Sequence, residues 1–155
     1  MSYENVKKYF ENLGLSKRII TRDNIDTVTH AAKVIGCKEA RIAKTMSFIV
    51  KDEPLVIVMS GDAKIDNAKY KAYFHQKAKM IAYEDVETII GHPPGGVCPF
   101  ALNPNINVYL DISLKRFETS HAAAGSANST IELSPEELEK YTNAKDWIDV
   151  CKGWK

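Results

Sequence analysis

The chain has 155 residues, of which 45% are hydrophobic and 26% are charged. This length and composition are typical of one globular domain that buries its own hydrophobic core, which excludes disordered and fibrous classes. No apolar run approaches the roughly 20 residues of a membrane-spanning helix, and the first residues lack the apolar segment of a signal peptide. We therefore expect a single domain over residues 1–155, a cytoplasmic location and no membrane partner.

The net charge of +1 is unevenly distributed. Residues 1–80 contain 15 Lys and Arg against 9 Asp and Glu, whereas residues 81–155 contain 6 against 11. One interpretation is a basic face for an anionic ligand beside an acidic back. The other is a chance clustering of charges on solvated helices.

The three cysteines and four histidines are dispersed along the chain. None of them forms a CxxC or HxxxH pair, the spacings that are typical of metal sites. An odd number of cysteines also argues against a disulfide framework. We therefore expect neither a metal ion nor another cofactor.

The N-terminal part predicts two helices. Val6, Phe10 and Leu13 recur at helical spacing before Gly14, which ends the first helix. A second helix is expected from about residue 27 to 35, with Gly36 after its last turn.

A hairpin follows these helices. Residues 42–50 alternate between two faces, residues 51–54 form a turn, and residues 55–59 are a continuous apolar strand. A run without polar residues indicates that the second strand is buried on both faces.

The second half of the chain mixes short helices and strands around one loop. Helices are expected over about 66–74 and 84–90 and from the capping box at Ser134 onward. Strands are expected at 80–81, 106–110, 129–133 and 147–150. The segment His92–Pro99 has three prolines and two glycines in eight residues, so it is an irregular loop. The whole pattern predicts one α+β domain.

Lys44 is the most unusual residue of the first predicted strand. It falls on the face of Ile42, Met46, Phe48 and Val50, where an ammonium group is disfavoured unless something pairs with it. One interpretation is an edge-strand lysine whose charge reaches solvent. The other is a lysine on a pocket wall that holds its charge for an anionic or carbonyl oxygen.

The loop contains two glycines, Gly95 and Gly96, that permit a close approach of the backbone to another group. Their N–H groups can converge on an oxyanion, and Pro99 stiffens the end of the loop. The alternative is an ordinary surface loop, because the segment matches neither a Walker loop nor a dinucleotide-binding fingerprint.

Two further features have competing interpretations. Residues 122–126 are a run of small side chains that either lines a tight pocket or allows two segments to pack closely. Cys98, close in sequence to His92, has the setting of a nucleophile, but no acidic third member is evident. Cysteine is more often a small hydrophobic residue.

These segments follow the order and spacing of the motifs of one known family. Residues 42–48 resemble the strand that carries the family's invariant lysine, and residues 60–69 resemble its G-D-x-x-x-D-x-x-K segment. Gly95–Pro99 resembles its GxxxP loop, and Asp111 with Ala124–Ser126 resembles its later motifs. Over about residues 27–135, the chain thus resembles the YbaK and prolyl-tRNA-synthetase-associated editing domains.

The resemblance implies an α+β fold with a mixed, strongly curved, barrel-like sheet flanked by helices. Members of this family hydrolyse the ester that joins a mischarged amino acid to the 3′ end of tRNA. Because no synthetase domain is evident, the resemblance implies an enzyme that acts in trans. Its expected partners are aminoacylated tRNA and, as a further candidate, an aminoacyl-tRNA synthetase.

The resemblance also implies roles for individual residues. Lys44 would contact the phosphate of the terminal adenosine or position the aminoacyl ester, and Gly95 and Gly96 would place amides near the scissile carbonyl. The family has no well-placed carboxylate base, and the 2′-hydroxyl of the tRNA helps to activate water. The residues expected to bind the substrate are Met46, Val97, Cys98, Pro99, Ala124, Gly125 and Ser126.

Two other functions remain open from the sequence. One is a catalytically inactive module of the same fold that binds tRNA or a synthetase. Lys44 and the GxxxP loop favour the enzyme over this module. The other is a hydrolase that uses Cys98 as its nucleophile.

Overall fold

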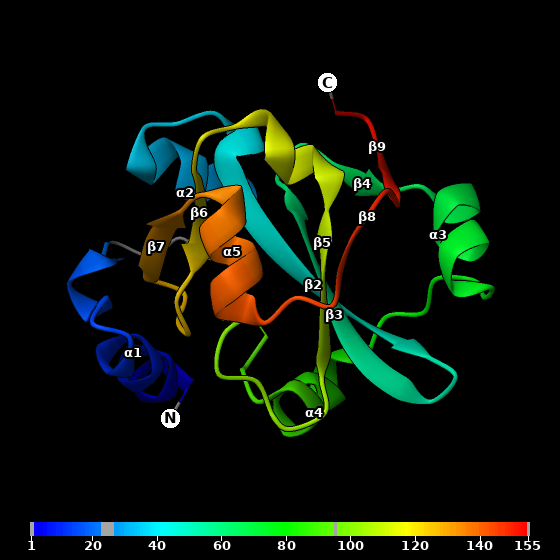
Figure 1. The fold of residues 1–155 in the computed structure, drawn as a ribbon, viewed down its shortest axis with the longest axis horizontal. Coiled ribbons are helices and arrows are strands. Elements are labelled where there is room, and N and C mark those ends of the chain that lie inside the picture. Colours follow the sequence, from blue (N-terminus) through cyan, green and yellow to red (C-terminus); the bar gives the residue numbers. More distant parts are fainter. Residues whose placement is uncertain (1, 23–26, 95, 155) are drawn as a thin grey trace.

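The computed structural model describes residues 2–22, 27–94 and 96–154. Its centre is a seven-stranded mixed sheet in the order β1-β7-β6-β2-β3-β5-β8 (Figure 1). The strands are β1 (Ile19–Thr21), β2 (Ile42–Val50), β3 (Glu53–Ser60), β5 (Asn107–Asp111), β6 (Ser120–Ala123), β7 (Ser129–Leu133) and β8 (Asp146–Ile148). Two short strands, β4 (Lys64–Ile65) and β9 (Cys151–Lys152), pair with each other in a separate antiparallel ribbon.

Five α-helices and four 3₁₀ turns surround the sheet in the described part of the chain. The helices are α1 (Ser2–Asn12), α2 (Val28–Ile35), α3 (Asn67–Phe74), α4 (Val86–Ile90) and α5 (Pro135–Thr142). The 3₁₀ turns are η1 (Ser16–Arg18), η2 (Glu39–Arg41), η3 (Tyr83–Asp85) and η4 (Ile112–Arg116). In Figure 1, α1 and α3 lie at opposite sides of the molecule. The expected mixed sheet flanked by helices is confirmed, and the sheet stays open, with β1 and β8 as its edges.

The expected hairpin is formed by β2 and β3. Its antiparallel register runs from Ala43 opposite Ser60 to Val50 opposite Glu53. On its other side β3 pairs in parallel with β5, so β3 is central and residues 55–60 are all buried. The continuous apolar run in the sequence is explained by this burial on both faces.

The other side of β2 is paired only at its ends. Ile42 and Ala43 lie opposite His121 and Ala122 of β6. Further along, Ile81 N–H donates to Ser47 O at 3.2 Å and Ile49 N–H donates to Lys79 O at 2.9 Å. Among the described residues, none pairs with residues 44–46 on this side, so the sheet has a gap beside Lys44.

Helix ends follow the signals in the sequence. Thr27 caps α2 through the N–H of His30, and Gly36 ends that helix with a φ of 84°. Asp66 caps α3, and Ser134 forms a reciprocal capping box with Glu137 at the start of α5. A side-chain cap satisfies N–H groups that the helix itself leaves unpaired, which is why these residues fix the ends.

The largest core cluster packs α1, α4 and α5 against one face of the sheet. Phe10 of α1 meets Phe100 edge to face, with ring centroids 4.8 Å apart, and so anchors the end of the proline–glycine loop. Leu13, the third apolar position of the expected helix, is 43% exposed and directly follows Asn12, the last residue of α1.

Candidate functional site

A cavity of about 480 Å³ opens beside the gap in the sheet. Its volume falls in the usual range for small-molecule sites, about 300–1,000 Å³. Residues 42–47 of β2 form one wall, and α2, the segment before α4 and the proline–glycine loop form the others. The cavity therefore exists because β2 leaves β6 after Ala43 and the loop does not fill the space between them.

Lys44 lies on the β2 wall and is half-buried. Burial lowers the pKa of its ammonium group, and nearby Asp62 offsets part of this effect. In the described part of the chain, the one protein acceptor within reach of its Nζ is the Gly61 carbonyl oxygen, at 3.5 Å. An ammonium has three donors and this contact is at the limit of a hydrogen bond, so most of its bonding capacity is unused.

Gly61 and Asp62, from the segment 60–69, build the surface behind Lys44. A Cβ placed on Gly61 would lie 2.2 Å from Glu39 O and 2.6 Å from Val28 Cγ1, so only glycine fits between β3 and α2. Asp62 pairs with Arg116, with Oδ1 and Nη2 at 2.7 Å. Gly61 and Asp62 therefore fix the position of the Gly61 carbonyl oxygen that Lys44 contacts.

The rest of that segment fixes α3 and the β4–β9 ribbon. The Asp66 carboxylate accepts the N–H groups of Ala68 and Lys69, which lowers the pKa of this carboxyl group. The Lys69 ammonium donates to Asp149 at 3.0 Å and to Cys151 O at 3.1 Å. The segment that resembles the family's G-D-x-x-x-D-x-x-K motif is therefore a structural support, with no side chain on the cavity lining.

The proline–glycine loop forms another wall of the cavity through Pro94 and Val97. Gly96 is buried against the small-residue segment, since a Cβ on it would lie 3.4 Å from Ser126 Cα. Its N–H donates to Pro93 O at 2.9 Å, so this amide is already used within the loop. Gly95 lies outside the described residues.

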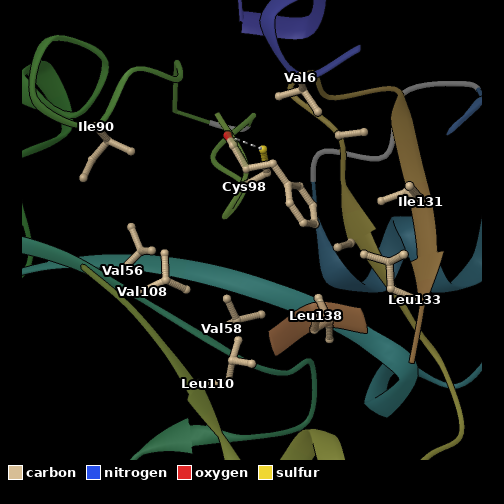
Figure 2. Packing of buried hydrophobic residues seen from close by; sticks show 14 of the residues in the cluster. Val6, Val56, Val58, Ile90, Cys98, Val108, Leu110, Ile131, Leu133 and Leu138 are labelled. Carbon is tan, nitrogen blue, oxygen red and sulfur yellow. Dashed lines mark hydrogen bonds between the residues drawn. The ribbon is translucent and has the colours of Figure 1, made fainter. Parts of the chain in front are cut away.

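Cys98 points into the core rather than into the cavity. Figure 2 shows its side chain among core residues such as Val6, Ile90 and Ile131. The residue is 0% exposed, and burial raises the pKa of its thiol to about 12. The group is therefore a neutral thiol near pH 7, which is a poor nucleophile.

His92 shares this buried position with Cys98. Its Nε2 lies 2.6 Å from Phe100 O and 3.5 Å from Cys98 Sγ, and burial lowers the pKa of its ring. A neutral ring that donates from Nε2 satisfies the Phe100 carbonyl, and Cys98 S–H donates to the same oxygen at 3.7 Å. Both side chains therefore fix the shape of the loop.

His121 is a cavity residue that the sequence did not single out. It is 8% exposed and lies opposite Glu132 across β6 and β7. Burial lowers the pKa of its imidazole, and the neighbouring carboxylate of Glu132 offsets part of this effect. Arg41 forms an ion pair with Glu132, with Nη2 and Oε2 3.1 Å apart.

The structure brings together part of the predicted site. Lys44, Met46, Val97 and Ser126 line the same cavity although they come from distant parts of the chain. The other described residues of the predicted site are buried but are not on the lining: Gly96, Cys98, Pro99, Ala124 and Gly125.

Most residues of the lining were missed, and the sequence signals of three of them differ. Thr45 neighbours Lys44 on the predicted strand, and His121 directly precedes the small-residue run, so both had a detectable signal. Tyr83 had none, because only the tertiary fold places it at the cavity.

Two further findings concern metals and membranes. In residues 2–22, 27–94 and 96–154, no three His, Cys, Asp or Glu side chains come together in a way that could hold a metal ion. Within the same ranges, every helix is too short or too polar to cross a bilayer.

Comparisons with known proteins place this geometry in context. Two relatives align over most of the chain. YwhH of Bacillus subtilis, an uncharacterised protein, is 45% identical over 157 residues and covers 100% of both chains. EbsC of Enterococcus faecalis, named as a proposed Cys-tRNA(Pro)/Cys-tRNA(Cys) deacylase, is 29% identical over 74% of this chain and 71% of its own length.

A larger protein aligns with most of this chain over part of its own length, and a solved structure has the same fold. Proline–tRNA ligase of Leuconostoc mesenteroides is 27% identical over 70% of this chain, which corresponds to 19% of the ligase. A crystal structure described as a proposed trans-editing enzyme for prolyl-tRNA synthetase superposes with a TM-score of 0.87 over 98% of both chains. At 24% identity this likeness shows the fold alone.

The model of one family, described as the aminoacyl-tRNA editing domain, matches residues 22–141. This match covers the lysine strand, the loop and the small-residue segment, which are the parts that enclose the cavity. Taken with the relative that is 45% identical over the full length, it shows that the chain belongs to the aminoacyl-tRNA editing domain family.

Proposed function

We propose that the protein is a trans-editing deacylase, which hydrolyses the ester between a mischarged small amino acid and the 3′ end of tRNA. The observation that carries this proposal is the cavity between β2 and the proline–glycine loop, with Lys44 on its wall. Membership of the editing family supports it, as does the similarity to EbsC, a proposed deacylase of cysteinyl-tRNA.

The lining suits a small aminoacyl group at the inner end of the site. Met46, Val97 and Ala123 offer apolar surface, and Thr45 and Ser126 offer hydroxyl groups at the same cavity. A pocket of this kind combines apolar contact with a few oriented polar groups, which is the usual composition of ligand sites. Lys44 would direct its largely unpaired ammonium to a phosphate or to the ester oxygen.

Hydrolysis requires water to add to the ester carbonyl and the tRNA hydroxyl to leave with a proton. The cavity lining contains no carboxylate among the described residues. The vicinal hydroxyl of the terminal ribose would therefore help to activate the water, with Lys44 stabilising the negative charge that develops.

We also propose that the amide N–H groups of Gly95 and Gly96 contact the oxyanion. The Gly96 N–H would have to exchange its bond to Pro93 O for one to the substrate. Such an exchange would couple substrate binding to a small change in the loop.

A deacylation panel tests the proposal. The purified protein is incubated with tRNA charged with Cys, Ala, Ser, Thr or Pro, and the release of each amino acid is measured against tRNA alone. The proposal requires accelerated release of at least one small amino acid. Binding of charged tRNA without accelerated release from any substrate would instead support an inactive binding module.

A further inference from the structure

Two large apolar side chains stand exposed at the rim of the cavity. Tyr83 is 77% exposed and Met80 is 53% exposed, and both contribute to the lining. The other exposed large hydrophobic residues in the described part of the chain are Leu13, Ile20 and Tyr73, and none of them touches the cavity. Exposed apolar surface that adjoins a pocket commonly marks a place where a ligand lies.

The backbone holds these two side chains in place. Met80 forms a bridge with Phe48 of β2, and Ile81 N–H donates to Ser47 O at 3.2 Å. On the other side of Tyr83, Val86 is only 6% exposed and anchors α4 in the core. Tyr83 is thus fixed between two anchored points, one of which is bonded to β2, the strand that carries Lys44.

The cavity has room for more than a small aminoacyl group. A volume of about 480 Å³ lies within the range for drug-sized ligands, and the aminoacyl group of an alanine or a cysteine is far smaller. If the amino acid occupies the inner end, the ribose and base to which it is esterified must extend toward the mouth. Tyr83 and Met80 lie on the part of the lining that is exposed to solvent.

We propose that Tyr83, with Met80 beside it, is the stacking surface for the terminal adenine of the tRNA. This inference rests on the proposed function. Tyrosine rings bind bases by stacking, because every base has a π-face that meets the ring. Methionine adds an adaptable apolar contact with a polarisable sulfur.

The charged residues on either side of Tyr83 and Met80 indicate from which side the 3′ end of the tRNA approaches. Lys77 and Lys79 are exposed on the segment that leads to Met80, whereas Glu84 and Asp85 are exposed directly after Tyr83. Phosphates are attracted to the lysines and repelled by the carboxylates. The phosphodiester chain of the 3′ end therefore approaches over the lysine side.

Kinetics of Tyr83 variants provide the first test. Loss of one base–aromatic stack weakens binding by about 5- to 150-fold, so Tyr83→Ala should raise KM by that factor and leave kcat within about threefold. Tyr83→Phe keeps the ring and should behave as the wild type. Tyr83→Leu keeps apolar bulk without a π-face and should resemble Tyr83→Ala. Leu13→Ala, which removes an exposed apolar side chain far from the cavity, is the matched control.

A binding experiment separates this inference from the proposed function. The probes are two uncharged acceptor-stem RNA minihelices, one ending in CCA and one with an abasic 3′ nucleotide. The wild type should prefer the adenine probe, and Tyr83→Ala should lose that preference. Equal binding of both probes by the wild type, or an unchanged preference in folded Tyr83→Ala, would overturn the stacking surface. Failure of the wild type to deacylate any substrate would instead count against the proposed function.

Discussion

At the scale of single residues, the chemistry of the loop is decided by burial. Cys98 and His92 are both 0% exposed and both direct polar atoms to the Phe100 carbonyl. A thiol whose pKa is raised to about 12 carries almost no thiolate between pH 6 and 9. The cysteine hydrolase suggested by the sequence therefore lacks an activated nucleophile.

Cys98→Ser should accordingly retain turnover within about tenfold, because the mechanism does not use the thiolate. The pH profile of kcat/KM should show no inflection from this cysteine below about pH 10, since the folded-state pKa lies near 12. Cys98→Ala is the control, because it removes the thiol without burying a hydroxyl group. Circular dichroism checks that both variants are folded. A trapped thioester, or a loss of more than about a hundredfold in a folded variant, would restore the cysteine mechanism.

Chemical labelling gives an independent view of the same residue. Burial raises the pKa of all three thiols, but Cys37 is partly exposed whereas Cys98 and Cys151 are buried. One cysteine should therefore react with a thiol reagent in the native protein, and three should react after unfolding.

At the scale of elements, the site is created by incomplete pairing of β2. This strand pairs with β3 from Ala43 to Val50 but meets β6 only at Ile42 and Ala43. An unpaired stretch of strand leaves backbone groups and side chains available to a ligand, which a complete sheet would bury. The support around Gly61 keeps this stretch from shifting.

Gly61→Ala should destabilise the protein severely, because the nearest obstacle to its Cβ is the Glu39 backbone oxygen at 2.2 Å. We expect a loss of about 3 kcal/mol in the free energy of unfolding, the upper end for overpacking. Urea denaturation measures this value. Gly36→Ala, where a Cβ meets open space and only the φ of 84° opposes alanine, should cost about 1–2 kcal/mol. Equal costs for the two variants would contradict the close approach.

Most elements could be predicted because their signals are local. The β2–β3 hairpin has its own alternation and turn, and the caps at Thr27, Asp66 and Ser134 each act within one helical turn. The match of residues 42–50 to the observed strand illustrates this.

The elements that were missed depend on distant partners. Residues 120–123 have a weak strand signal, yet they form β6 because β2 and β7 pair with them on both sides. The short strands β1, β4 and β9 likewise exist only as partners of other strands. Tyr83 escaped notice for the same reason, since a cavity is a property of the assembled sheet.

At the scale of the whole molecule, the modest charge limits the affinity for tRNA. The net charge is +1, and the lysines that we expect to contact phosphates are Lys64, Lys69, Lys71, Lys77 and Lys79. Lys69 is already bonded to Asp149 and to Cys151 O, so the other four are available.

We therefore expect weak tRNA binding with a shallow dependence on salt. Each neutralised phosphate contributes about 0.7–0.9 to the slope of log affinity against log salt, so four contacts give a slope of magnitude below about 4. Titrations of uncharged tRNA at several salt concentrations measure this slope, and Lys77→Ala combined with Lys79→Ala should reduce it by about 1.5. A nanomolar complex that persists at high salt would contradict this prediction.

The role of Lys44 is the central claim, and the deacylation rate of Lys44→Ala tests it most directly. Removal of an oriented charge from the reacting centre should lower kcat/KM by about a hundredfold or more on the best substrate of the panel. The fold should survive, because the half-buried ammonium has one weak contact and its removal relieves desolvation. Lys44→Arg should also be poor, since a planar guanidinium does not replace a compact ammonium in a confined site. Lys145→Ala, an exposed lysine outside the cavity, should keep full activity as the matched control. A Lys44→Ala protein with a native circular dichroism spectrum and wild-type kcat/KM would contradict the account.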